Sequence, residues 1–260
     1  MEGRDGKLPV SVVIITWNEE SRIRECLRSV QWAQECIVVD DESTDRTREI
    51  CEEEGAKVFV RKMEIEGVHR NWAYAKASQP WVLSLDADER VTPGLYEEFK
   101  QLLAGNPEFN GYTMPRRNFI GKRWLKHGGW YPSAQLRFFR KGEFQYEEVS
   151  VHPRAIFDQA WGNLKNDLLH YSYRDVGDFL GKLNRQTDLE ARKWAEDGRK
   201  MSLGRAIRKT LDRFFRAYLM KKGYRDGFMG FVAAVFGGLY QFVTYAKYRE
   251  IMAGREGASV

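Results

Sequence analysis

Two carboxylates, one residue apart, follow an apolar run in the first half of the chain. Residues 81–85 read Trp-Val-Leu-Ser-Leu, and Asp86 and Asp88 come directly after them. Side chains alternate in direction along a strand, so both aspartates should lie on the same side where the chain leaves the strand. Carboxylate oxygens suit a hard divalent cation, Mg²⁺ or Mn²⁺, that also binds substrate phosphates. The pair therefore predicts a metal-bridged diphosphate, with turn closure or helix capping as the alternative.

Polar residues also follow two earlier apolar runs. Thr16, Asn18 and Glu19 come after the first run, and Asp40 and Asp41 come after the second. Their oxygens can accept hydrogen bonds from a nucleobase N–H or from ribose hydroxyls. The alternative is structural, because acidic residues also stabilise the N-terminus of a helix.

The elements that must position these residues alternate between apolar strands and amphipathic helices. We expect strands at 10–16, 36–39 and 57–60, and helices at 19–30 and 44–54. This order predicts an α/β fold with a mostly parallel sheet that has helices on both faces. Ligands of such sheets bind outside the carboxyl ends of the strands, where these polar residues should gather.

The second half of the chain has a different texture. Residues 111–157 consist of short aromatic and β-branched runs broken by glycines, which predicts antiparallel strands and active-site loops. From about Arg174 onward the pattern is helical, and basic residues are dense between Arg199 and Arg225. We expect a helical, basic and amphipathic region over 174–260.

An uncharged stretch from Phe228 to Ala246 has three interpretations. Its 19 residues are just long enough for a bilayer span, but Gly230, Gly237 and Gly238 dilute its hydrophobicity. The other interpretations are an amphipathic element on the membrane surface and a helix packed on the soluble core. The flanking Lys and Arg residues favour the surface-bound element.

Composition sets limits on the class of protein. A chain of 260 residues that is 43% hydrophobic and 30% charged is globular, not disordered. Its net charge of +5 fits phosphate-bearing ligands or an anionic membrane, but it is too small to indicate nucleic-acid binding. The three cysteines have neither zinc-site nor disulfide spacing, and the N-terminus does not read as a signal peptide, so we expect a cytoplasmic protein.

Five motifs stand in a characteristic order along the chain. They are Val-Val-Ile-Ile-Thr-Trp-Asn-Glu-Glu at 12–20, Leu-Ser-Leu-Asp-Ala-Asp-Glu-Arg-Val at 83–91, His-Gly-Gly-Trp-Tyr-Pro at 127–132, Leu-Arg-Phe-Phe-Arg at 136–140 and Leu-Leu-His-Tyr at 168–171. In these motifs the chain resembles a family 2 glycosyltransferase with a GT-A fold. Within that family it is most similar to the lipopolysaccharide-core β-glucosyltransferases.

The resemblance implies an inverting, metal-dependent transfer of a hexose, with glucose expected, from a UDP-sugar to a membrane-borne glycan such as lipopolysaccharide core. It places the metal at Asp86 and Asp88, with His170 either joining that site or serving a structural role. The acceptor should meet His127, Trp130, Tyr131 and Arg137. The nucleotide-sugar should contact Thr16, Asn18, Glu19, Asp40, Asp41, Arg70 and Asp86, although Arg70 could also be an exposed helix residue.

The general base that inversion requires is the weakest part of the match. The family commonly has acidic residues where this chain has Ser133 and Pro153. Glu148 is our candidate base, with Glu147 and His152 as neighbouring alternatives. Glu89 is a second candidate, although orienting the metal site is a competing role for it.

The resemblance also predicts an organisation and a location. We expect a glycosyltransferase domain at 1–173, divided into a nucleotide-sugar half at 1–105 and an acceptor half at 106–173. The 174–260 region should hold the enzyme at the inner face of the cytoplasmic membrane as a peripheral protein. Two alternatives stay open: a different acceptor, namely polyprenyl phosphate, protein or exopolysaccharide, and a non-catalytic nucleotide-sugar binder.

Overall fold

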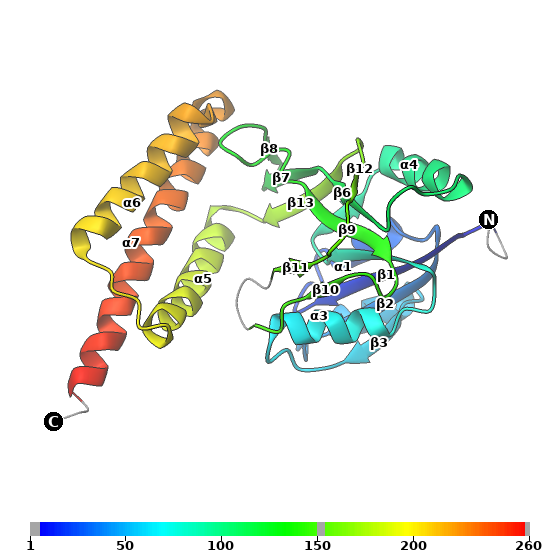
Figure 1. Cartoon of the computed structure of the whole chain (residues 1–260), viewed down its shortest axis with the longest axis horizontal. Helices are drawn as coiled ribbons and strands as arrows, with labels where there is room; N and C mark the ends of the chain where they lie inside the picture. Colours follow the sequence, from blue (N-terminus) through cyan, green and yellow to red (C-terminus); the bar gives the residue numbers. More distant parts are fainter. Residues whose placement is uncertain (1–5, 150–153, 258–260) are drawn as a thin grey trace. The chain divides into compact units, whose positions relative to one another are not determined.

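The computed structural model describes residues 6–149 and 154–257. The chain forms two compact units: the first is Met1–Arg116 with Ala134–His170, and the second is Arg117–Ser133 with Tyr171–Val260. Figure 1 follows the chain through both units. The C-terminal helices expected from the sequence make up most of the second unit. Residues 117–133 join them, although the sequence predicted this segment within the acceptor half of the first domain.

The first unit is built on a seven-stranded sheet in the order β12-β6-β9-β4-β1-β2-β3. The central strand β1 pairs in parallel with β2 and β4, and β9 runs antiparallel to β4 and β6. The predicted α/β fold with a mostly parallel sheet is therefore confirmed. The strands of this sheet are β1 (Leu8–Thr16), β2 (Ala33–Asp40), β3 (Lys57–Val60), β4 (Trp81–Asp86), β6 (Gly111–Met114), β9 (Gln135–Arg140) and β12 (Gly162–Asn163).

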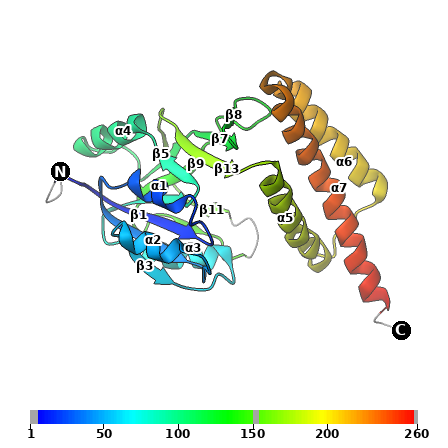
Figure 2. The ribbon, with the colours of Figure 1, turned by 180° about the vertical axis from the view of Figure 1, so that it is seen from behind.

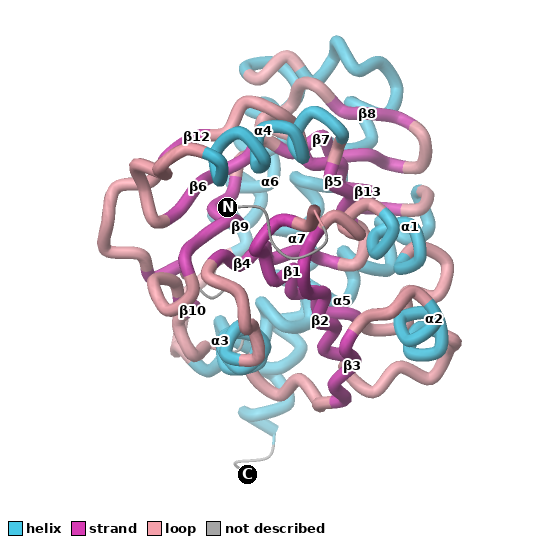
Figure 3. Tube along the Cα trace, turned by 90° about the vertical axis from the view of Figure 1, so that its right-hand side faces the viewer, coloured by secondary structure: helices cyan, strands magenta, loops and turns pink. Residues whose placement is uncertain are grey.

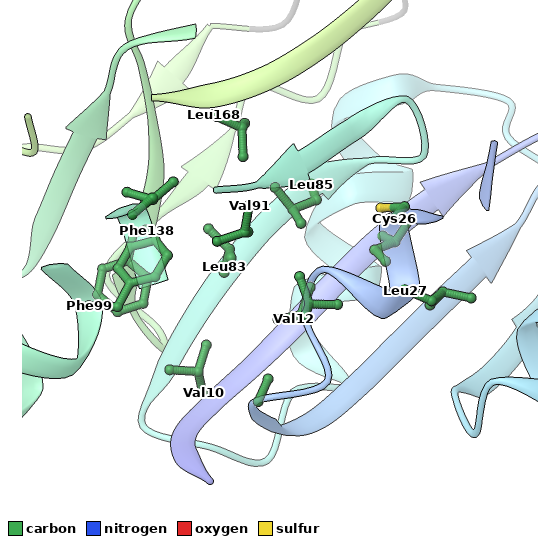
Figure 4. Close-up of a cluster of buried hydrophobic side chains, with 14 of the residues drawn as sticks. Val10, Val12, Cys26, Leu27, Leu83, Leu85, Val91, Phe99, Phe138 and Leu168 are labelled. Atoms are coloured by element: carbon green, nitrogen blue, oxygen red, sulfur yellow. The ribbon is translucent and has the colours of Figure 1, made fainter. Parts of the chain in front are cut away.

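Helices cover both faces of this sheet, which is why its central strands are apolar almost throughout. On one face α1 (Ile23–Arg28), α2 (Thr47–Glu53) and α4 (Pro93–Ala104) pack on a core that includes Val10, Val12 and Phe99. Figure 4 shows part of this core. On the other face α3 (Glu66–Ala75) covers Val13 and Val39, and Figure 3 shows α1 and α2 opposite α3.

The first two helices are shorter than predicted because their flanking polar residues bind to each other. We expected helices at 19–30 and 44–54, but α1 begins at Ile23 and α2 at Thr47. The backbone N–H of Glu19 donates to Thr47 Oγ1 at 2.8 Å, and that of Glu20 donates to Asp45 at 3.1 Å. These long-range hydrogen bonds hold both segments as loops at the carboxyl edge of the sheet.

Two short strand pairs complete the first unit. β5 (Glu89–Val91) runs antiparallel to the start of β13 (Leu168–Tyr173), with His170 opposite Glu89. This pairing returns the chain to the turn that follows β4. β10 (Gln145–Tyr146) pairs with β11 (Ala155–Ile156).

The second unit joins a β-hairpin to a group of helices. The hairpin consists of β7 (Arg116–Ile120) and β8 (Arg123–Leu125). Figure 2 shows the last helix lying beside the two before it. The buried side chains of this unit include Leu125, Phe179 and Ala233. The helices are α5 (Val176–Glu196), α6 (Leu203–Phe215) and α7 (Gly227–Gly257), with a π-helical turn η1 (Arg216–Met220) and a 3₁₀ turn η2 (Gly223–Asp226) between the last two.

The uncharged stretch of the sequence lies in α7. Among the described residues, one helical segment, Gly223–Gly254, is long and apolar enough to cross a membrane by length and composition, and its most apolar 18-residue window has a mean hydropathy of 1.4. Only 39% of its most apolar window is buried in the structure. Gly238 is one of its packing positions, because an added Cβ would lie 2.9 Å from Thr210 O on α6. Gly238 thus allows close contact between α7 and α6.

Candidate functional site

The polar residues selected from the sequence gather at one edge of the sheet. Thr16 at the end of β1 is in register with Asp40 at the end of β2. Asp86 at the end of β4 is in register with Ile15. Three parallel strands therefore deliver their terminal polar side chains to the same edge, as the strand order requires.

Asp86 is held between two arginines. Arg70 Nη2 donates to Asp86 Oδ1 at 3.1 Å, and Arg137 Nη2 donates to Asp86 Oδ2 at 2.7 Å. Burial by itself would raise the pKa of Asp86, but the positive charges of Arg137 and Arg70 hold that pKa far below its usual value. Arg137, which we predicted to contact the acceptor, is 4% exposed and donates to Asp86.

Asp88 lies in the turn after Asp86 and faces His170 and Arg22. His170 Nε2 is 3.6 Å from Asp88 Oδ1, and Arg22 Nη1 is 4.0 Å from Asp88 Oδ2. The pairing of β5 with β13 creates this arrangement from residues far apart in the sequence.

The donors at this turn fit a cation that is shared with a substrate. A carboxylate and an imidazole both ligate divalent metals. Among the described residues, no group of three or more His, Cys, Asp and Glu side chains is arranged to hold a metal ion. An ion at the predicted pair, Asp86 and Asp88, would therefore complete its shell with water and substrate phosphate, as Mg²⁺ usually does.

Glu89 supports the turn from inside. Its side chain has no exposed surface, Oε2 accepts from the backbone N–H of Asp86 at 3.0 Å, and Oε1 lies 3.3 Å from Arg116 and 3.9 Å from Arg137. A general base must reach the acceptor hydroxyl. The geometry favours the competing role of orienting the metal site over the predicted catalytic role.

Glu148 is exposed in a bend after β10. It lines a pocket of about 280 Å³ with Asn71 and Tyr74, and the residues that line this pocket include neither Asp86 nor Asp88. Its neighbour Glu147 accepts from the backbone N–H of Arg154 at 3.2 Å. His152 and Pro153, which also entered the argument about the base, lie outside the described residues.

Asn18 and Glu19 shape their own loop. Asn18 Oδ1 accepts from the backbone N–H of Thr44 at 2.8 Å, and its own N–H donates to Ser43 Oγ at 2.8 Å. Asn18 has φ of 52°, a left-handed conformation that asparagine tolerates. Glu19 is engaged by Arg22 at 2.6 Å. Both side chains hold the loop at the edge of the sheet, whereas the structural alternative considered above was stabilisation of a helix N-terminus.

Thr16 and Asp40 carry buried oxygen atoms without a partner. The two residues are 3% and 0% exposed, and neither Thr16 Oγ1 nor Asp40 Oδ1 has a hydrogen-bond partner. The other oxygen of Asp40 accepts from the backbone N–H of Ser43 at 2.8 Å. An unsatisfied buried polar atom costs about 1–3 kcal/mol, so these two atoms are candidates to bind ligand hydroxyls.

A pocket of about 320 Å³ near Asp41 was not predicted from the sequence. Asp41 Oδ1 accepts from the backbone N–H of Met63 at 2.6 Å, and the pocket is lined by Arg61 and His69 among others. His69 is 1% exposed, and neither of its ring nitrogens has a partner. Burial is the main cause that lowers the pKa of His69, which favours a neutral imidazole.

Three predicted acceptor residues lie in the second unit. The backbone N–H of His127 donates to Asp226 Oδ2 at 2.8 Å, and its Nδ1 is 2.9 Å from Asp226 Oδ1. Trp130 is half-buried, with its ring 6.0 Å from that of Phe179. Tyr131 packs edge-on against another aromatic ring. All three residues therefore make contacts that support the fold of the second unit.

A buried thiol lies beneath the carboxylate turn. Cys26 on α1 has no exposed surface, and its Sγ is 3.7 Å from the backbone oxygen of Asp86. Burial raises the pKa of Cys26 well above its usual value.

The α/β sheet, with acidic and basic groups gathered at its carboxyl edge, has the organisation expected of a glycosyltransferase. The chain belongs to Glycosyl transferase family 2, because the model of that family matches residues 11–159. The predicted family and GT-A class of fold are thereby confirmed.

Several known proteins are similar to this chain along most of its length. It is 29% identical to the lipopolysaccharide core biosynthesis glycosyltransferase LpsC of Rhizobium meliloti, with 93% of this chain and 92% of LpsC covered. It is 26% identical to the uncharacterized glycosyltransferase RT0209 of Rickettsia typhi, with 93% and 87% covered. The crystal structure of S. aureus TarS 1–349 aligns with a TM-score of 0.44, 17% identity, and 94% and 92% coverage.

Proposed function

We propose that this glycosyltransferase moves a hexose, with glucose expected, from a UDP-sugar to a membrane-borne glycan such as lipopolysaccharide core, with inversion at the anomeric carbon. The similarity to LpsC along 93% of the chain supports the class of acceptor. The observation that carries the reaction type is the turn after β4, where Asp86 and Asp88 lie among arginines and His170. Such a site can bind a diphosphate and stabilise it as a leaving group.

The donor would occupy the carboxyl edge of the sheet. Thr16 Oγ1 and Asp40 Oδ1 would bind hydroxyl or N–H groups of the nucleoside, because both atoms are buried and unpartnered. The pocket beside Asp41 and His69 would take the base, while Asn18 and Glu19 shape the adjoining loop. Arg70 would contact the diphosphate, since its Nη1 is buried without a partner while Nη2 binds Asp86.

Asp86 and Asp88 are the residues that would hold Mg²⁺ or Mn²⁺, since each oxygen of Asp86 accepts one hydrogen bond from an arginine and keeps a second lone pair for an ion. His170 Nε2 lies beside them, 3.6 Å from Asp88 Oδ1. When bound, a divalent cation neutralises negative charge that develops on the departing diphosphate. Arg137 and Glu89 would act as positioning residues that fix Asp86 and its turn.

Glu148 remains the proposed base. It is exposed, as a group that must reach an acceptor hydroxyl has to be. Since Ser133 and Pro153 stand where the family commonly has acidic residues, a non-catalytic nucleotide-sugar binder is the second candidate function. That candidate predicts UDP binding without turnover.

The second unit would hold the enzyme at the inner face of the cytoplasmic membrane. Large apolar side chains recur every four residues on α6 and η1, and each is at least 43% exposed. Residues four apart share one face of a helix. We call this set the α6 stripe; it consists of Leu203, Ile207, Leu211, Phe215 and Leu219. Basic residues lie between its members, as in helices that bind anionic lipid surfaces.

The test is UDP release by the purified full chain. A panel of UDP-sugars is supplied with Mn²⁺ or with a chelator, and with or without extracted lipopolysaccharide core. The proposal expects metal-dependent release from one donor that the core stimulates. Product recovered only in lipid-phosphate, peptide or exopolysaccharide fractions would replace the acceptor. Metal-dependent UDP binding with no release under any acceptor would establish the binder instead.

A further inference from the structure

The second unit contains a pocket with an aromatic wall. Its volume is about 340 Å³, and it is lined by α5, α6, η1, α7 and the segment around Trp130. Trp130, Tyr173, Phe179 and Phe236 form a continuous set of ring contacts, with Tyr173 and Phe179 stacked at 4.0 Å. This volume lies at the lower end of the range for small-molecule sites, about 300–1,000 Å³. It suits a head group and part of one chain, not a whole lipid.

Three cations line the same pocket: Arg213, Arg216 and Lys221. Arg216 is paired with Asp212 at 2.9 Å. Within the described ranges, no ion pair is found for Arg213 or Lys221, and no Asp or Glu lines the pocket. Arg213 instead lies over the ring of Tyr240 at 5.5 Å. The pocket therefore combines an apolar wall with positive charge that its own lining does not balance.

Further basic residues on and before α6 add to this positive charge. The pKa of Lys209 on α6 is lowered by partial burial and by the nearby charges of Arg199, Arg213, Arg205 and Arg208. Such clustered positive charge attracts anions, and guanidinium groups match phosphate geometry.

We infer that this pocket binds an amphiphile with a net negative phosphate head and an apolar chain. The phosphate would meet Arg213, Arg216 and Lys221, and the chain would lie along the aromatic wall. Two sources have this chemistry: a phosphorylated glycolipid acceptor and a membrane phospholipid. The binding itself does not depend on sugar transfer, and only the acceptor assignment rests on the proposed function.

Gly237 provides a way to fill the pocket without disturbing the helix pair. An added Cβ at Gly237 would meet nothing within 4 Å, although Gly237 lines the pocket. At the next residue, Gly238, a Cβ would lie 2.9 Å from Thr210 O. Leucine at 237 should therefore occupy pocket volume, and it also favours the helix relative to glycine.

The experiment is calorimetric titration of the full chain, without donor, at low ionic strength. The probe is dihexanoyl phosphatidic acid, used as monomers, and the comparison ligands are dihexanoyl phosphatidylcholine and inorganic phosphate. We expect saturable binding of the phosphatidate, and about tenfold weaker binding of both comparison ligands. The phosphate of phosphatidylcholine is a diester whose negative charge is balanced by choline, and inorganic phosphate lacks the apolar chain. Equal affinity for phosphatidate and phosphatidylcholine would overturn the inference.

Two variants test the location of binding. Gly237→Leu should weaken phosphatidate binding at least about tenfold by filling the pocket. Gly254→Leu is the matched control, since the same change on the same helix meets nothing within 4 Å and lies outside the pocket lining. Unchanged binding by folded Gly237→Leu protein, judged by thermal melting, would overturn the site. So would equal losses in both variants.

A third variant tests the charges. The double substitution Arg213→Gln and Lys221→Gln should abolish the preference for phosphatidate over phosphatidylcholine, while the thermal midpoint stays near that of the unmodified chain. A retained preference would contradict the assignment of the head group.

Competition then identifies the source. Displacement of the phosphatidate by extracted lipopolysaccharide core would identify the acceptor, and displacement only by phosphatidylglycerol vesicles would identify the membrane. Because donor is absent, failure of sugar transfer leaves these measurements intact. Normal transfer by a chain that does not bind phosphatidate would remove this inference alone.

Discussion

The charged side chains at the carboxyl edge of the first unit are paired with one another, whereas, in the part of the chain that the structure describes, two of the three cations in the pocket of the second unit are not. At the edge, Asp86 lies between Arg70 and Arg137, and buried Glu89 contacts Arg116. In the pocket, Arg213 and Lys221 have no carboxylate partner among the described residues. The first arrangement is balanced before any ligand arrives, so its groups are held in fixed positions.

This difference separates the contribution of charge to folding from its contribution to ligand binding. Removing one partner of a buried ion pair leaves an uncompensated charge, so substitutions at the edge should affect folding as well as ligand binding. Exposed cations are solvated and screened by salt, so substitutions at the pocket should affect binding alone. The following predictions test that separation, from the largest effect to the smallest.

Asp88→Ala should lower metal-dependent UDP release by about a thousandfold or more, because it removes a proposed metal ligand next to the leaving diphosphate. The measurement is steady-state UDP release across a Mn²⁺ titration. Glu52→Ala, on the exposed face of α2, is the control and should behave like the unmodified chain. An unchanged Mn²⁺ response in Asp88→Ala would exclude this residue from the metal site.

Arg137→Met should destabilise the first unit by about 3–5 kcal/mol, because it leaves Asp86 buried with one fewer partner. Arg213→Met, an exposed residue, should change stability by no more than about 0.5 kcal/mol. Urea unfolding of both variants measures the contrast. Similar midpoints for the two variants would show that the edge is not the balanced site described here.

Glu35 extends the comparison to a balanced charge elsewhere in the first unit. Burial opposes ionisation, but hydrogen bonds from Lys57, Ser11 and Ser78 lower the pKa of Glu35 to about 2 from 4.5. A depressed carboxyl pKa stabilises the fold above the unfolded-state pKa, and the gain is lost as pH falls toward 2. Glu35→Gln should therefore destabilise by about 3 kcal/mol at neutral pH.

The pH dependence gives the check on Glu35. Thermal or urea unfolding from neutral pH downward should show the difference between Glu35→Gln and the unmodified chain shrinking below about pH 4.5. A difference that does not vary with pH would mean that packing, not ionisation, explains the effect.

Leu211→Glu should weaken binding to phosphatidylglycerol vesicles about tenfold, because one apolar side chain of the α6 stripe no longer enters the lipid. The control is Leu189→Glu on α5, since Leu189 is 50% exposed and Leu211 is 51% exposed. Vesicle sedimentation measures both variants. Equal loss in the control would mean that added negative charge, not the stripe, reduces binding.

The sequence was sufficient for the parts of the fold that depend on local pattern. The strand at 57–60 matches β3, and the carboxyl edge follows from the alternation of strands and helices. The helices at 19–30 and 44–54 were predicted too long because Glu19 and Glu20 bond across to the second loop. Such pairing between distant segments leaves no local trace.

The same reason limits the prediction of the site. Arg137 and buried Phe139 are two residues apart on β9 and so share one face of the strand, which indicates that Arg137 points inward. The sequence does not show that Asp86 is its partner there. His69 directly precedes Arg70 in the sequence, and only the fold reveals that both nitrogens of His69 are buried without partners. Whether a buried polar atom at this edge has a partner is decided by the folded structure, not by the local sequence.

The thiol of Cys26 beneath the Asp86 turn has a practical consequence. Because it is fully buried and its pKa is raised, it should react with a thiol reagent only when α1 separates from the turn. Its labelling rate would then report how often the edge of the sheet opens. If donor and metal bind there, they should slow the labelling, so the chain carries an internal probe of its own occupancy.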